Sequence, residues 1–200
     1  MVETAQRIDH RTRPRRRGQV LNQAIFAAAM TELAEVGYAH FTMGRVAERA
    51  GTGRASLYRR WPGRGELVLD AVRHVVGESI DLADHGELRA DLLALLGSAT
   101  DVLAGPVGEA MRGLLADSLH DPGLTRAARS HVPGAGDELV LEILRRGAVR
   151  GEVRPQALTP RVAGVGPALL RLHFLVHGAP IGDEVLAEIV DEVILPLVRI

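Results

Sequence analysis

The chain of 200 residues contains no cysteine, no lysine, one tryptophan, two tyrosines and three phenylalanines. Without cysteine there can be no disulfide bond, no thiolate metal site and no cysteine nucleophile. The N-terminus lacks the apolar segment of a secretory signal peptide, and no apolar run reaches the length of a membrane span. The sequence therefore predicts a cytoplasmic protein with no membrane partner, long enough to bury a sizeable core.

Charge is divided unequally along the chain, although the formal net charge is −1. Residues 1–65 contain twelve arginines and five acidic residues, whereas residues 66–200 contain twelve arginines and twenty acidic residues. A basic first third beside an acidic remainder indicates one module that binds a polyanion and another that avoids polyanions. Six arginines fall between positions 7 and 17, so residues 1–18 are expected to form a flexible basic arm, or else a solvated tail without a role.

The hydrophobic pattern predicts an all-α fold of nine or ten helices, with no strand. Thr42 stands where an N-cap is expected, and Gly37 stands where a left-handed residue would end the first helix. Glycine and proline punctuate the rest of the chain. The helices are expected over residues 19–36, 43–50, 54–61, 64–77, 88–103, 107–119, 121–131, 137–150, 160–177 and 181–200.

Two short helices joined by a glycine-containing turn, residues 43–61, form a helix-turn-helix pattern. Such a unit lays its second helix in the major groove of DNA. Five of the six aromatic residues lie at or before position 61, where bulky side chains would close a small core. The alternative is a three-helix packing unit whose arginines are only solvated.

Several side chains of this pattern are expected to contact double-stranded DNA. Arg54 and Arg60 would read base edges, whereas the Tyr58 hydroxyl and Arg64 would bond phosphates. The expected DNA-binding set is Thr42, Arg45, Arg54, Ala55, Ser56, Tyr58, Arg59, Arg60, Trp61 and Arg64.

The segment AGTGRASLYRRWPGRGEL, residues 50–67, resembles the signature of the TetR family of bacterial repressors. The preceding GYAHFTMGRVAERA, residues 37–50, resembles the family segment before it, so the similarity covers about residues 20–70. The sequence departs from the family pattern at Gly53, where serine is favoured, and at Arg60, which replaces an aromatic residue. The resemblance implies that residues 19–66 bind a palindromic operator, whereas residues 67–200 dimerise and hold a small-molecule effector.

The last two predicted helices are apolar over more than one face, which indicates burial on more than one side. A single helix-turn-helix reads only a half-site, so a homodimer is expected to supply the second. The resemblance implies a four-helix dimer interface, and a plain monomer core is the alternative. The expected interface residues are Val162, Leu169, Leu172, Val176, Leu186, Ile189, Val190, Val193 and Leu197.

The effector is expected to be small and apolar. Phe174 is the only aromatic residue beyond position 61, which excludes an aromatic cage for a flat cation. The expected lining residues are Met111, Leu115, Leu144, His173 and Phe174. No cofactor is expected.

His173 and His177 have the i, i+4 spacing of a metal-binding pair, although HFLVH lacks the glutamate of the metalloprotease pattern. A third ligand would have to come from Asp117, His120 or His131, so packing is favoured and no metal is expected.

No acid, base and nucleophile form a set, which disfavours an all-α enzyme with an ancillary helix-turn-helix. A ligand-independent, architectural DNA-binding dimer remains the other alternative to a ligand-responsive repressor.

Overall fold

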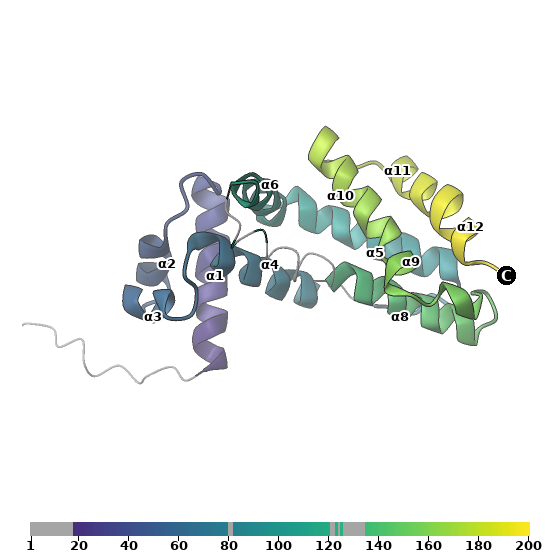
Figure 1. The fold of residues 1–200 in the computed structure, drawn as a ribbon, viewed down its shortest axis with the longest axis horizontal. Coiled ribbons are helices and arrows are strands. Elements are labelled where there is room, and N and C mark those ends of the chain that lie inside the picture. Colours follow the sequence, from purple (N-terminus) through teal and green to yellow (C-terminus); the bar gives the residue numbers. More distant parts are fainter. Residues whose placement is uncertain (1–17, 80–81, 121–122, 124, 126–134) are drawn as a thin grey trace, which may run out of the picture.

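The computed structural model describes residues 18–79, 82–120, 123, 125 and 135–200 (Figure 1). Within these ranges the protein is helical and contains no strand, apart from an isolated antiparallel bridge between Val153 and Arg199. The prediction of an all-α fold is therefore confirmed. The basic arm lies outside the described residues except for Gly18, and so does most of the helix expected over 121–131.

The N-terminal helices begin where the sequence predicts. They are α1 (Gln19–Val36), α2 (Met43–Arg49), α3 (Arg54–Tyr58) and α4 (Arg64–Ser79). Thr42 caps α2, because its hydroxyl accepts a hydrogen bond from the Arg45 amide at 3.3 Å. Gly37 and Gly51 have φ of 69° and 64°, a region that favours glycine, and they end α1 and open the turn before α3. Helix α3 stops earlier than predicted, because the chain tightens after Tyr58 and turns Trp61 inward.

Of the remaining described helices, those between residues 88 and 149 lie within two residues of the predicted bounds, whereas those after residue 155 are more divided than the pattern suggests. They are α5 (Leu88–Ala104), α6 (Pro106–Ser118), α8 (Ala135–Val149), the turn η1 (Pro155–Ala157), α9 (Pro160–Ala163), α10 (Val165–His177), α11 (Asp183–Glu188), the π-helical turn η2 (Ile189–Ile194) and α12 (Leu195–Val198). The helix expected over 160–177 is divided at Gly164. The last helix contains a π-helical turn just before Pro196, which has no amide hydrogen to continue the α-helical ladder.

Two hydrophobic clusters organise the chain. The first joins α1 to α4 around Ile25, Leu33 and Leu57, and Ala110 of α6 packs into it. The second joins α5, α8, α10 and the C-terminal helices. Figure 1 shows α1, α2 and α3 grouped at one end, with α4 leading from them toward the second cluster.

No single described helix is long and apolar enough to cross a bilayer. Only α5 and α6 taken together reach that length, and they are bent by 75° at their junction.

Candidate nucleic-acid interface and effector cavity

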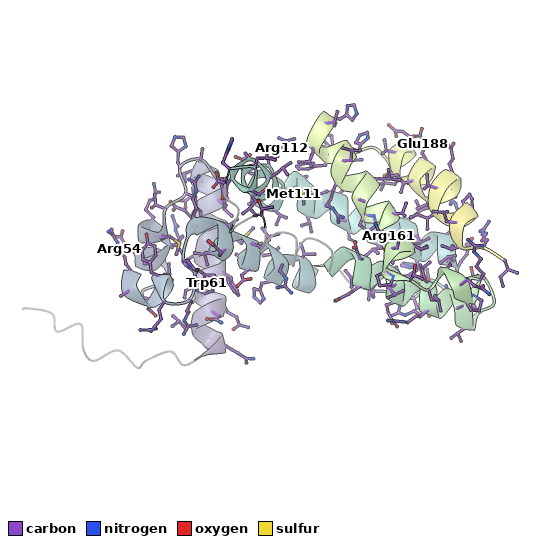
Figure 2. The ribbon with its side chains drawn as sticks, in the orientation of Figure 1. Arg54, Trp61, Met111, Arg112, Arg161 and Glu188 are labelled. Atoms are coloured by element: carbon purple, nitrogen blue, oxygen red, sulfur yellow. The ribbon has the colours of Figure 1, made fainter. Side chains whose placement is uncertain are left out.

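Helix α3 is anchored by one buried side chain, half-buries a second and exposes the others. Leu57 is fully buried, whereas Arg54, Ala55 and Arg59 are exposed and Tyr58 is 53% exposed. Figure 2 shows Arg54 at the end of the molecule farthest from the C-terminal helices. The Arg54 guanidinium lies over Gly44 of α2, where a Cβ would stand 3.0 Å from Nη2. The exposed side of α3 therefore carries cations, a phenol and no carboxylate, a combination suited to phosphates and base edges.

Trp61 does not belong to this exposed surface. Its side chain is only 5% exposed, and its indole Nε1 donates a hydrogen bond to Asp70 Oδ2 at 2.8 Å. Its ring packs edge-on against Phe26, with centroids 5.7 Å apart. The prediction that Trp61 contacts DNA is wrong, because the chain after α3 turns this large apolar side chain into the first cluster (Figure 2).

Arg45 is directed toward a carboxylate rather than toward solvent phosphates. Its Nε lies 2.8 Å from Oε1 of Glu32, a fully buried residue of α1, and Arg49 lies 3.5 Å from Oε2 of the same group. These contacts are ion pairs without hydrogen-bond geometry. A buried carboxylate needs counter-ions. Arg45 therefore compensates charge between α1 and α2, and its expected DNA contact stays a prediction. The exposed Arg60 donates a hydrogen bond to Asn22 Oδ1.

Arg64 joins the helix-turn-helix to the rest of the chain. Its Nη2 lies 3.0 Å from Asp117 Oδ2 in α6, and the Tyr38 hydroxyl donates to the same oxygen at 2.8 Å. The Arg64 guanidinium also lies over the Tyr38 ring, 4.8 Å from its centroid. We call Tyr38, Arg64 and Asp117 the interdomain cluster. Asp117 is thus the anion beside Arg64 within the chain itself, and the expected phosphate contact of Arg64 stays a prediction.

Protonation of the interdomain cluster follows from this geometry. Burial raises the pKa of the Tyr38 phenol, and its hydrogen bond to the Asp117 carboxylate raises it further. Burial alone would also raise the pKa of Asp117. The hydrogen bonds from Tyr38 and Arg64 outweigh it, so the pKa of Asp117 is lowered. A neutral phenol, a carboxylate and a guanidinium therefore hold α6 against α4 near neutral pH.

A cavity of about 440 Å³ lies between α4, α5, α6 and α10. That volume is within the usual range of small-molecule sites, about 300–1,000 Å³. Met111 and Leu115 line it, as the sequence suggested (Met111 is labelled in Figure 2). Leu69, Val72 and Val76 of α4 also line it.

Three residues that we expected to line this cavity do not, so those predictions are wrong. Leu144 is fully buried in the second cluster. Phe174 is buried beneath the Arg112 guanidinium, which lies 4.6 Å from its ring centroid (Figure 2 labels Arg112). The His173 ring stacks on that of His177, with centroids 4.6 Å apart. Among the described residues no three histidine or acidic side chains are arranged to hold a metal.

Two arginines, Arg73 of α4 and Arg171 of α10, also line the cavity, and neither was predicted from the sequence. Arg171 Nη1 lies 4.0 Å from Asp137 Oδ1, its one ion-pair partner in the described part of the chain. Burial lowers the pKa of the Arg171 guanidinium, and the nearby Asp137 carboxylate offsets part of that effect. The sequence feature that could have indicated Arg171 is its position as a single arginine within the apolar stretch VGPALLRLHFLVH.

The residues expected at a dimer interface divide into two groups. Leu172, Val176 and Leu197 are exposed, and Val162, Leu169 and Val193 are half-buried. Leu186, Ile189 and Val190 are buried within the chain's own second cluster, so assigning them to an interface is wrong. Leu172 and Val176 are 58% and 66% exposed and lie one turn apart on α10. Helix α10 packs beside the C-terminal helices (Figure 1).

Comparisons with known proteins agree with this arrangement. A model of bacterial regulatory proteins of the tetR family matches residues 25–71, and a model described as the tetracyclin repressor-like C-terminal domain matches residues 82–193. The chain is 30% identical over 184 residues to the DNA-binding transcriptional repressor TetR of Mycobacteroides abscessus, covering 92% of this chain and 96% of that protein.

Further similarity comes from a curated protein and a solved structure. The chain is 25% identical to the HTH-type transcriptional regulator YdeS of Bacillus subtilis over 183 residues, which is 90% of each. The structure of the TetR family transcription regulator SCO0332 superposes with a TM-score of 0.77 at 27% identity, covering 87% of this chain and 96% of that one. The helix-turn-helix, the second helical cluster and these matches together show that the chain belongs to the TetR family and is a DNA-binding transcriptional regulator.

Proposed function

We propose that this regulator is a repressor that releases a palindromic operator when a small molecule occupies the cavity. The proposal rests mainly on the position of α4, which extends from the helix-turn-helix to the cavity. Its residues Leu69, Val72 and Val76 line the cavity, while its first residue, Arg64, lies beside the helix-turn-helix. The Mycobacteroides abscessus relative is described as a repressor, which supports the direction of regulation. Since the proposed partner is bacterial operator DNA, the proposed place of action is the cytoplasm.

The proposed switch acts through α4 and α6 together. Both helices line the cavity, and Arg64 and Asp117 join them at the end nearest the helix-turn-helix. A ligand that favours one tilt of α4 would change the separation of the two α3 helices in a dimer. That separation should be about 34–36 Å, one turn of DNA. To change the ratio of operator-bound to released protein from 99:1 to 1:99, the ligand must favour the released state by about 5.5 kcal/mol.

The proposed DNA contacts are those on the exposed side of α3 and beside it. Arg54 and Arg60 would read bases, while Tyr58 and Arg59 would bond phosphates. Thr42, Ala55 and Ser56 complete the proposed contact set. We retain the division into a basic arm (1–18), a DNA-binding unit (19–66) and an effector-binding unit (67–200) as part of the proposal.

The proposed assembly is a homodimer through α10 and the C-terminal helices. Exposed Leu172 and Val176 on α10 and Leu197 on α12 support it, because exposed large apolar side chains are typical of an interface. Replacing both Leu172 and Val176 with arginine should give a monomer in sedimentation analysis. Val149→Arg is the matched control, since Val149 is 91% exposed at the end of α8 and should leave the dimer intact. A double variant that sediments like the wild type would contradict the proposed interface.

The proposed function is tested by selecting bound duplexes from a random DNA pool with the full-length chain. The expected result is a two-fold symmetric site with half-sites about one helical turn apart. Ligand coupling is reciprocal, so a ligand that releases this site must bind the DNA-bound protein more weakly by the same factor. A ligand that binds both forms equally would instead support the ligand-independent alternative.

A further inference from the structure

We propose that the cavity binds an amphipathic carboxylate, with an apolar body against α4, α5 and α6 and its carboxylate on Arg171. The proposal rests on the ligand site of the proposed function and names the chemical class of the ligand. It refines the sequence-based expectation of an apolar effector, since most of the wall remains apolar.

The distribution of charge along the wall supports an anion. Among the described residues, the charged groups that line the cavity are Arg73 and Arg171, and no aspartate or glutamate lines it. A cation surrounded by apolar side chains loses hydration, and only a hydrogen-bonded anion compensates that loss well. Two positive charges at one apolar cavity also disfavour a cationic ligand, most strongly beside the partly buried Arg171, because like charges repel more where water is scarce.

The partner that the chain itself offers to Arg171 is incomplete. The distance of 4.0 Å between Arg171 Nη1 and Asp137 Oδ1 is longer than a hydrogen bond. Asp137 Oδ1 is buried and accepts no hydrogen bond from the described residues. A guanidinium has five N–H donors in a planar fork, so the Arg171 head retains donors for a second carboxylate. A bidentate carboxylate matches that fork in shape and charge.

Arg73 makes the same cavity more positive from the side of α4. It forms no hydrogen bond or ion pair with the described residues, and its side chain is exposed at the cavity rim. A carboxylate on Arg171 would therefore be attracted by both arginines, and Asp137 beside Arg171 would offset part of that attraction. Because Arg73 belongs to the helix that leads to Arg64, the ligand's charge would act on the helix that the proposed switch requires.

The test compares matched ligands that differ only in the head group. Decanoate, decanol and decylammonium form one set, and naphthoate and naphthamide form a second with a broader apolar body. Each is titrated calorimetrically into the full-length protein without DNA. We expect at least one carboxylate to bind about ten- to a hundred-fold more tightly than its neutral counterpart, as for a hydrogen-bonded charge in a partly buried site. The ammonium compound should bind more weakly than the alcohol.

Variants identify the head-group partner. Arg171→Met should remove the preference for carboxylate while leaving the affinity for the neutral compound nearly unchanged. Arg171→Lys should retain part of the preference, because it keeps the charge but loses the fork. Arg145→Met is the matched control, since Arg145 is exposed on α8 and does not line the cavity. Thermal melting of each variant checks that it is folded.

Two results would overturn the inference: neutral compounds that bind the wild type as tightly as the carboxylates, or a carboxylate preference that survives in folded Arg171→Met. Failure of both carboxylates to bind would overturn it as well. Release of the selected DNA site is measured separately. If a carboxylate binds but the DNA stays bound, the ligand class stands and the ligand-released repressor does not. If no carboxylate binds while DNA binding is intact, the ligand class is wrong and the proposed ligand-released repressor is not contradicted.

Discussion

Gly113 of α6 lies against the ring of Tyr38, so closely that a Cβ at position 113 would stand 2.1 Å from Cδ1 and 2.2 Å from Cγ. No side-chain rotation of a neighbour relieves a contact with the inner atoms of an aromatic ring. A glycine at this position therefore allows α6 to approach the loop before α2. The same approach brings the Tyr38 hydroxyl to Asp117, one turn further along α6.

The first prediction is that Gly113→Ala destabilises the protein and weakens DNA binding. Overpacking of this kind costs about 1–3 kcal/mol, and the shift of α6 would also separate Asp117 from Arg64. Urea denaturation and a gel-shift titration measure the two effects. Gly97→Ala is the control, because a Cβ there meets nothing within 4 Å. That control should be neutral or stabilising by about 0.5–1 kcal/mol, as for other helical glycines. Equal behaviour of the two variants would argue against a tight contact between α6 and Tyr38.

The second prediction concerns acid. The pKa of Asp117 is lowered in the folded protein, so its contribution to stability is fully present above the ordinary carboxyl pKa of about 4. That contribution is lost as the pH falls below this value toward the lowered pKa. Asp117→Asn should therefore be less stable than the wild type at about pH 7, and the difference should narrow at about pH 3. Urea midpoints at the two pH values measure it. A difference that stays constant would mean that the carboxylate charge is not what stabilises the contact.

The third prediction separates the two tyrosines. Tyr58 is exposed on α3, so Tyr58→Phe should weaken DNA binding through a lost phosphate bond while the melting temperature stays the same. Tyr38→Phe removes a partly buried hydrogen bond to Asp117 and should lower stability by about 1–3 kcal/mol. Differential scanning calorimetry and fluorescence anisotropy with labelled DNA distinguish the two. A fall in the melting temperature of Tyr58→Phe would show that its hydroxyl has a structural role.

The fourth prediction distinguishes two arginines that look equivalent in the sequence. Arg45→Ala leaves the buried Glu32 with only Arg49 beside it and should cost about 1–3 kcal/mol of stability. Arg59→Ala, on the exposed side of α3, should leave stability unchanged and weaken DNA binding. It should also reduce the slope of the logarithm of the binding constant against the logarithm of salt concentration by about 0.9. Unfolding curves and binding at several salt concentrations test both. An unchanged slope for Arg59→Ala would place that side chain away from the phosphates.

Much of the fold was predictable because local signals agree with the tertiary structure. The cap at Thr42 and the left-handed glycine at Gly37 mark helix ends that depend on neighbouring residues alone. The interruption at Gly164 and the π-helical turn before Pro196 were harder to predict, because the hydrophobic periodicity of the sequence continues through both. Their position depends on how the C-terminal helices pack rather than on hydrophobic spacing.

The individual site residues were harder to predict than the helix-turn-helix pattern itself. Arg45 and Arg64 are cations beside a DNA-binding motif, and nothing in their local sequence shows that Glu32 and Asp117 approach them. Asp117 is 53 positions from Arg64, so the pairing depends on the tertiary approach of α6. Leu186, Ile189 and Val190 were misassigned for a similar reason, since an apolar helix face looks the same whether its own chain or a partner covers it.

Leu172 lines the cavity and also belongs to the exposed surface through which we propose that two copies pair. In such a dimer the same side chain would contact both the ligand and the second subunit, so it would take part in two binding equilibria. Mass action then links them, so that the ligand concentration needed for half-occupancy depends on how much protein is present. A cell holding few copies and a cell holding many would respond to the same metabolite at different thresholds. Titrations at several protein concentrations would reveal that dependence.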